Sequence, residues 1–176
     1  MNKEDPDLNI GNFHAYAAHV FDGSLQQQYF NDVDLDAVKV VEGCLATFKN
    51  ARADANVIRK TLADLTTSLT FAGLCSIPDF SLATYETQAF GDEGLYETKY
   101  VRNNNVVPLL SALLHLSVQP IRKMHCEAGS TEVLASMWMC VSLIARIHVI
   151  EMDEIIDVAA KQLEAQFPGR TPRRNV

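Results

Sequence analysis

Apolar residues recur every three and four positions in the last third of the chain, and this spacing predicts three consecutive helices over Val106–Phe167. Pro108 suits the first turn of the first helix, Ser130 can cap the second, and Pro168-Gly169 ends the third. We expect these helices to form the core that the rest of the chain covers. Their predicted buried residues are Leu109, Leu110, Leu113, Leu114, Leu116, Val118, Val133, Leu134, Met137, Trp138, Val141, Ile144, Ala145, Ile155, Ile156, Ala159, Leu163 and Phe167.

Helical spacing also covers most of the preceding sequence, so we predict an all-α multi-helix bundle in a single domain, 1–176. The earlier helices are expected near 13–21, from Asp34 or Asp36 to about 48, over about 54–74, and from an Asp79 cap to 89. The expected irregular parts are a loose leader at 1–10, an exposed acidic loop at 90–105 and a basic tail at 169–176.

Two of the earlier helices have a clear predicted inward face. In the second helix, the residues expected to point inward are Val38, Val41, Leu45 and Phe48. In the third helix, the predicted stripe consists of Val57, Ile58, Thr61, Leu62, Leu65, Leu69 and Ala72.

The formal net charge of −7 argues against a surface that holds duplex nucleic acid by neutralising phosphates. No apolar run reaches the ~18 residues of a membrane span, and the polar, acidic start is unlike a signal peptide. We therefore expect a cytoplasmic protein without a membrane partner. The four cysteines are far apart in the sequence and are expected to be reduced, with no metal or disulfide role.

Asp32, Asp34 and Asp36 alternate like the start of a calcium loop, but Ala37 and Gly43 occupy the positions where an EF-hand needs glycine and glutamate. The five histidines show no spacing that places two on one helix face as metal ligands, and no nucleophile, dinucleotide or P-loop motif occurs. We expect no metal site from these residues.

Residues 113–123 (LLHLSVQPIRK) and 132–138 (EVLASMW) resemble the MazG-like all-α nucleotide pyrophosphohydrolases. Residues 143–146, 152–156 and 161–168 are similar to the closing helices of that family. The resemblance implies a MazG-like helical bundle. In such a bundle, ExxE and ExxD pairs on two helices bind Mg²⁺, which holds a nucleoside triphosphate for hydrolysis at the α-phosphorus.

This chain departs from the family at the metal-binding acids. Leu116 and Gln119 take the place of the ExxE pair, and Ala135 takes that of the ExxD aspartate. Glu132 alone matches, and one carboxylate cannot hold two Mg²⁺ ions against their hydration shells. Glu132 is thus a weak catalytic candidate, and it is equally explained as an acid in the first turn of its helix.

The resemblance then predicts a protein that is non-hydrolytic and that binds a nucleotide or a protein partner in a regulatory or sequestering role, without a cofactor. Its predicted ligand-binding residues are Gln119, Arg122, Lys123 and Glu132. Because family members assemble through helical faces, a homo-oligomer is also expected. One alternative is an interaction module that uses the acidic loop. The other is an active Mg²⁺-dependent pyrophosphohydrolase with a displaced site. Its acids would be Glu127, Glu132, Glu151 and Asp153, or those from Glu86 to Glu97 of the long loop.

Overall fold

The computed structural model describes residues 7–20, 33–50, 52–77, 79–90, 107–112, 115 and 127–170. Within these ranges every regular element is a helix, which confirms the all-α class. The helices are α1 (Phe13–Val20), α3 (Val33–Lys49), α4 (Ala55–Ser76), α5 (Leu82–Phe90), α8 (Glu127–Ile147) and α9 (Met152–Gln166), and residues 107–112 are also helical.

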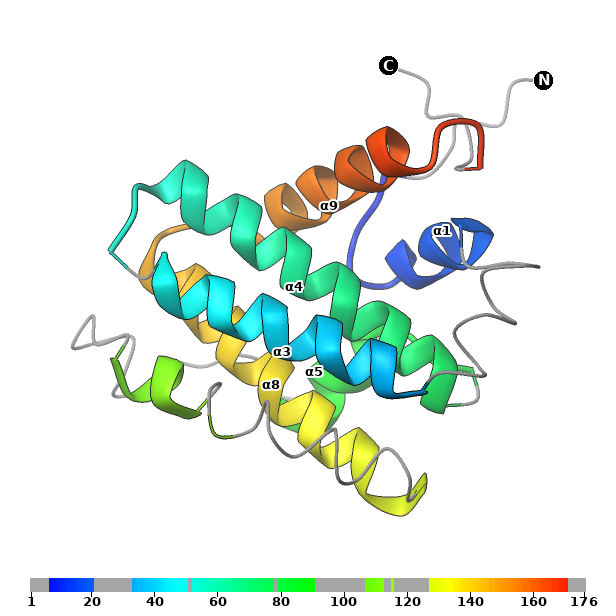
Figure 1. Cartoon of the computed structure of the whole chain (residues 1–176), viewed down its shortest axis with the longest axis horizontal. Helices are drawn as coiled ribbons and strands as arrows, with labels where there is room; N and C mark the ends of the chain where they lie inside the picture. Colours follow the sequence, from blue (N-terminus) through cyan, green and yellow to red (C-terminus); the bar gives the residue numbers. More distant parts are fainter. Residues whose placement is uncertain are drawn as a thin grey trace.

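Helix α4 is the centre of the described structure. It packs against α3, α8, α9 and α1, and Figure 1 shows it crossing the middle of the molecule between α9 and α3. Leu62, Leu65, Leu69 and Ala72 are fully buried, as predicted. Thr66 and Thr70 are also fully buried, so solvent is excluded from more of α4 than its apolar stripe. Residues 106–167 were expected to form the core that the rest of the chain covers. The helix with the most neighbours is instead α4, so this prediction is wrong about which helix is central.

The start of α4 is fixed by its cap. The Asp54 carboxylate accepts hydrogen bonds from the backbone N–H groups of Asn56 and Val57, at 2.9 and 3.0 Å, and these donors have no partner inside the helix. Helix α4 ends where Ile77 turns to extended backbone while its N–H still donates to the Gly73 carbonyl. Val57, predicted to face inward, is 38% exposed, whereas the next residue, Ile58, is buried.

Helices α8 and α9 confirm most of their predicted inward faces. Every predicted inward residue of α8, from Val133 to Ala145, is buried, and in α9 the predicted positions are buried except Phe167, which is partly exposed. The predicted start of α8 is wrong. The helix begins at Glu127, so Ser130 lies inside its first turn rather than at a cap, and Glu132 lies beyond that turn. Gly129 lies inside α8, where a helix tolerates a glycine at a modest cost.

The connection from α8 to α9 is a tight corner. The Ile150 N–H donates to the Ala145 carbonyl at 2.9 Å, and the His148 N–H donates to the Ile144 carbonyl at 3.1 Å. Between them Val149 has a φ of 55°, in the left-handed region that glycine normally occupies at a helix end. Its side chain is 85% exposed, so packing contributes little to holding this backbone conformation.

The chain between α4 and α5 turns at Asp79, which has a φ of 54°. Aspartate tolerates this conformation better than most residues. The predicted Asp79 cap is wrong, because α5 begins only at Leu82, directly after Ser81. Ser81 fits the capping position better: its carbonyl accepts from the Thr84 N–H at 3.0 Å, and the two hydroxyl oxygens are 3.2 Å apart.

Before α1, residues 7–12 form a turn. The Asn9 N–H donates to the Asn12 side chain at 2.8 Å, and the Asn9 side chain accepts from the Gly11 N–H at the same distance. Leu8 and Ile10 are partly buried against the core. The rest of the expected leader, most of the expected acidic loop and most of the basic tail lie outside the described residues.

Candidate functional site

Three of the four predicted ligand-binding residues, Gln119, Arg122 and Lys123, lie outside the described residues. Glu132 belongs to α8, but the description does not extend to its side chain. The structure therefore does not place these four residues relative to one another.

Two of the acids suggested for a displaced hydrolytic site, Glu151 and Asp153, are exposed at the start of α9. Glu86 is half-buried on α5. Among the residues that the structure describes, no group of three or more His, Cys, Asp or Glu side chains is arranged to hold a metal ion.

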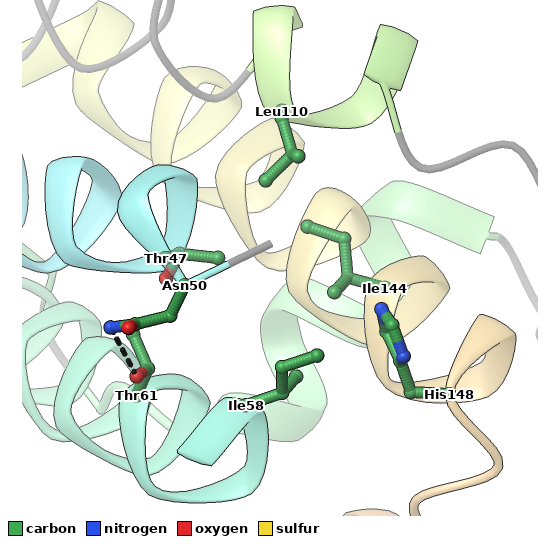
Figure 2. Close-up of a pocket in the computed structure, with 7 residues that line it drawn as sticks. All are labelled: Thr47, Asn50, Ile58, Thr61, Leu110, Ile144 and His148. Atoms are coloured by element: carbon green, nitrogen blue, oxygen red, sulfur yellow. Dashed lines mark hydrogen bonds between the residues drawn. The ribbon is translucent and has the colours of Figure 1, made fainter. Parts of the chain in front are cut away.

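A narrow cleft lies where the ends of α3 and α8 meet the start of α4 (Figure 2). Its empty space, including the part open to solvent, is about 200 Å³. Asn50 donates one hydrogen bond to the Ala46 carbonyl at 3.0 Å and one to the Thr61 hydroxyl at 3.2 Å. The lining residues are Thr47, Asn50, Ile58, Thr61, Leu110, Ile144 and His148.

His148 faces this cleft from the end of α8, opposite Asn50 and Thr61 (Figure 2). Its Nε2 atom is buried and has no hydrogen-bond partner in the described part of the chain. Burial lowers the pKa of the imidazole, so at neutral pH the ring is uncharged. The polar groups of the cleft are thus neutral, and those of Asn50 and Thr61 are already bonded to one another. We interpret the cleft as a packing seam between helices.

A second polar cluster joins α5 to α8. The Ser142 hydroxyl, which is buried, donates to the Glu86 carboxylate at 3.4 Å. Burial raises the pKa of Glu86, while the nearby Trp138 indole and the Ser142 hydroxyl favour the ionised carboxylate and oppose that shift. The Trp138 indole nitrogen is itself buried without a hydrogen bond of good geometry. Trp138 is fully buried and therefore cannot stack on a nucleotide base at the surface.

Helix α3 packs on α4 through its small residues. A β-carbon at Gly43 would lie 3.1 Å from Leu65 Cδ1 and 3.3 Å from Leu65 Cα, so the two helix backbones approach closely there. Val40, Cys44 and Thr47 are buried on the same side of α3. The inward face of α3 therefore differs from the predicted one, because close helix contact selects small residues rather than the bulkiest apolar ones.

The bulky residues predicted to point inward lie on a flank of α3, next to the buried set. Leu45 is 38% exposed, Phe48 is 47% exposed and Val41 is partly exposed. Their spacing of four and then three residues places them in one stripe along the helix. Glu42 and Lys49, both exposed, lie along one edge of this stripe. We call these five residues the α3 outer face.

A helix whose apolar residues extend well beyond its buried face is typically covered over that wider surface. Among the described helices, α3 packs chiefly on α4, and Leu45 and Phe48 remain exposed beside that contact. The α3 outer face is therefore the described surface best suited to bind another molecule. Sequence periodicity found its apolar residues but assigned them to the core.

No protein-family model, curated protein or solved structure matches this chain. Among the described residues, no single helix is long and apolar enough to cross a membrane. One strongly bent pair, 133–147 with 152–166 at 111°, meets that requirement jointly, by length and composition only.

Proposed function

We propose that this protein works by binding, without hydrolysis, and that it recognises a helix of a partner protein through the α3 outer face. The observation that carries the proposal is the exposure of Leu45 and Phe48 in one stripe with Val41, on a helix whose neighbouring face already packs on α4. Exposed apolar side chains that line up along a helix form the kind of surface that an amphipathic partner helix covers.

The proposal is tested by replacing Phe48 with a photo-crosslinking phenylalanine analogue in cells that make the protein. We expect a crosslinked protein product from position 48, identified by mass spectrometry. The same analogue at Gln166, an exposed position at the end of α9, is the matched control and should give little product.

Leu45→Glu places a charge in the stripe and should abolish the product from position 48, while leaving the helical circular dichroism unchanged. Equal crosslinking from positions 48 and 166, or crosslinking that survives Leu45→Glu, would contradict recognition through this face.

Nucleotide binding by Gln119, Arg122, Lys123 and Glu132, on a MazG-like bundle in the cytoplasm, remains a second proposal. It is supported by the sequence resemblance, and the all-helical class is compatible with it. Its test is thermal stability with a panel of nucleotides, with and without Mg²⁺. A ligand at ~100 times its Kd adds about 2.7 kcal/mol of stability, which gives a clear shift in Tm. A shift that requires Mg²⁺ would instead favour the hydrolase alternative.

A further inference from the structure

We infer that the α3 outer face pairs with the same face of a second copy of this chain, with the two α3 helices antiparallel. The inference rests on the proposed function and names the partner of the same surface. The observation behind the inference is that two opposite charges, Glu42 and Lys49, lie beside the apolar stripe.

Glu42 and Lys49 are seven residues apart and therefore lie on the same edge of the stripe, two turns from each other. A two-fold axis that makes two helices antiparallel keeps this edge on the same side in both copies. The Glu42 edge of one copy then faces the Lys49 edge of the other.

The apolar residues set a register that agrees with this pairing. Suppose that Leu45 of each copy packs against Phe48 of the other. In an antiparallel pair, residues at the same height along the helix axis then have numbers that add up to 93, whereas Glu42 and Lys49 add up to 91. The remaining offset is two residues, or about 3 Å along the axis, which both long side chains can span. One symmetric arrangement thus covers the exposed rings and leucines and forms two Glu42–Lys49 pairs.

Opposite charges placed in this way make the face complementary to itself, so a second copy satisfies both of them. The apolar area on one stripe is small, so the interface falls at the low end of protein–protein contacts and the dimer is weak. The experiment therefore uses the purified full chain across a range of concentrations, from about 1 to about 500 µM, by sedimentation velocity.

We expect the chain to pass from monomer to dimer over this range, and Leu45→Glu to remain monomeric. Glu42→Lys alone places lysine opposite lysine, and Lys49→Glu alone places glutamate opposite glutamate. Each single variant should weaken self-association by about tenfold or more. All three substituted side chains are exposed, so the variants should fold as the parent does.

The two single variants provide the decisive control. Mixed together they present lysine opposite glutamate at both pairs, so the mixture should dimerise as a heterodimer. The double variant Glu42→Lys/Lys49→Glu should dimerise by itself for the same reason.

A dimer that is unaffected by Leu45→Glu, or single variants that are not rescued by mixing, would overturn this pairing. A chain that stays monomeric at every concentration would overturn self-pairing as well. If position 48 then still crosslinks to a different protein, the proposed recognition through the α3 outer face holds and only the identity of the partner changes. If position 48 crosslinks to nothing, both proposals fail.

Discussion

Gly73 of α4 lies directly against the ring of Phe80, so closely that a β-carbon at residue 73 would be 2.6 Å from two of the ring atoms. The Phe80 ring is also held by Tyr85, whose ring packs against it with the centroids 4.8 Å apart. Phe80 and Tyr85 are both buried. This contact fixes the return of the chain from the central helix onto α5.

We therefore expect Gly73→Ala to destabilise the protein by about 1–3 kcal/mol, the usual cost of overpacking. This is the reverse of the gain of about 1 kcal/mol that alanine gives over glycine in an unobstructed helix. Urea unfolding followed by circular dichroism measures the change. Because Phe80→Leu removes the ring, the double variant should lose less stability than the sum of the single variants. A Gly73→Ala protein as stable as the parent would contradict the contact.

A substitution at the corner between α8 and α9 should increase the stability of the protein. Val149 is β-branched and holds a φ of 55° while 85% exposed. A left-handed residue other than glycine costs about 1–2 kcal/mol, and glycine loses about 0.4–1 kcal/mol through its freer unfolded chain. Val149→Gly should thus stabilise the protein by about 0.5–1 kcal/mol and raise Tm by about 1–4 °C. Val149→Ala, which keeps a β-carbon, is the matched control and should gain less. A lower Tm for Val149→Gly would show that the strain is absent.

Glu86 should make stability depend on pH. Its pKa is raised in the folded protein, so between the unfolded and folded pKa values the folded state binds more protons than the unfolded state. The stability from this group is therefore present below the unfolded pKa and is lost as the pH rises through the folded pKa.

Glu86→Gln removes the titration and keeps an oxygen that can accept from Ser142. We expect the free energy of unfolding of the variant, minus that of the parent, to be larger at pH 8 than at pH 5. Urea unfolding at both pH values measures this difference. Asp64, whose pKa is also raised by burial, and His14 and His148, whose pKa values are lowered, titrate in both proteins and cancel in the comparison. A difference between parent and variant that does not change with pH would contradict a perturbed Glu86.

The thiols of Cys44 and Cys140 should be unreactive in the folded protein. Both side chains are 1% exposed, and burial raises the pKa of each to about 12, with Cys140 contributing to the shift at Cys44. Since the thiolate is the reactive form, iodoacetamide at pH 8 should leave both residues unmodified until urea is added. Peptide mass spectrometry resolves each site. Labelling of either cysteine in the folded protein at the rate of glutathione would show that it is accessible.

The sequence by itself determined the helical class, the position of most helices and the inward faces of α8 and α9. In α9 the large apolar residues form a single stripe, so only one orientation removes them from water. Helix α8 is buried on nearly all sides, Leu143 included, so its predicted stripe could hardly be exposed. For the α3 outer face, the sequence predicted which apolar residues lie together but not that they are exposed. Periodicity identified Val41, Leu45 and Phe48 as a set, but α3 has a second set at Val40, Cys44 and Thr47, and the two sets compete for the core.

Only the tertiary structure decided between these faces. Gly43 allows α3 to lie against Leu65 of α4, and this approach requires the small side of α3 to point inward, which leaves Leu45 and Phe48 in solvent. The central position of α4 was likewise not readable from its own residues, because the burial of Thr66 and Thr70 depends on neighbours distant in the chain. Local spacing specifies which residues share a side of a helix, whereas the shapes of the other helices determine which side is covered.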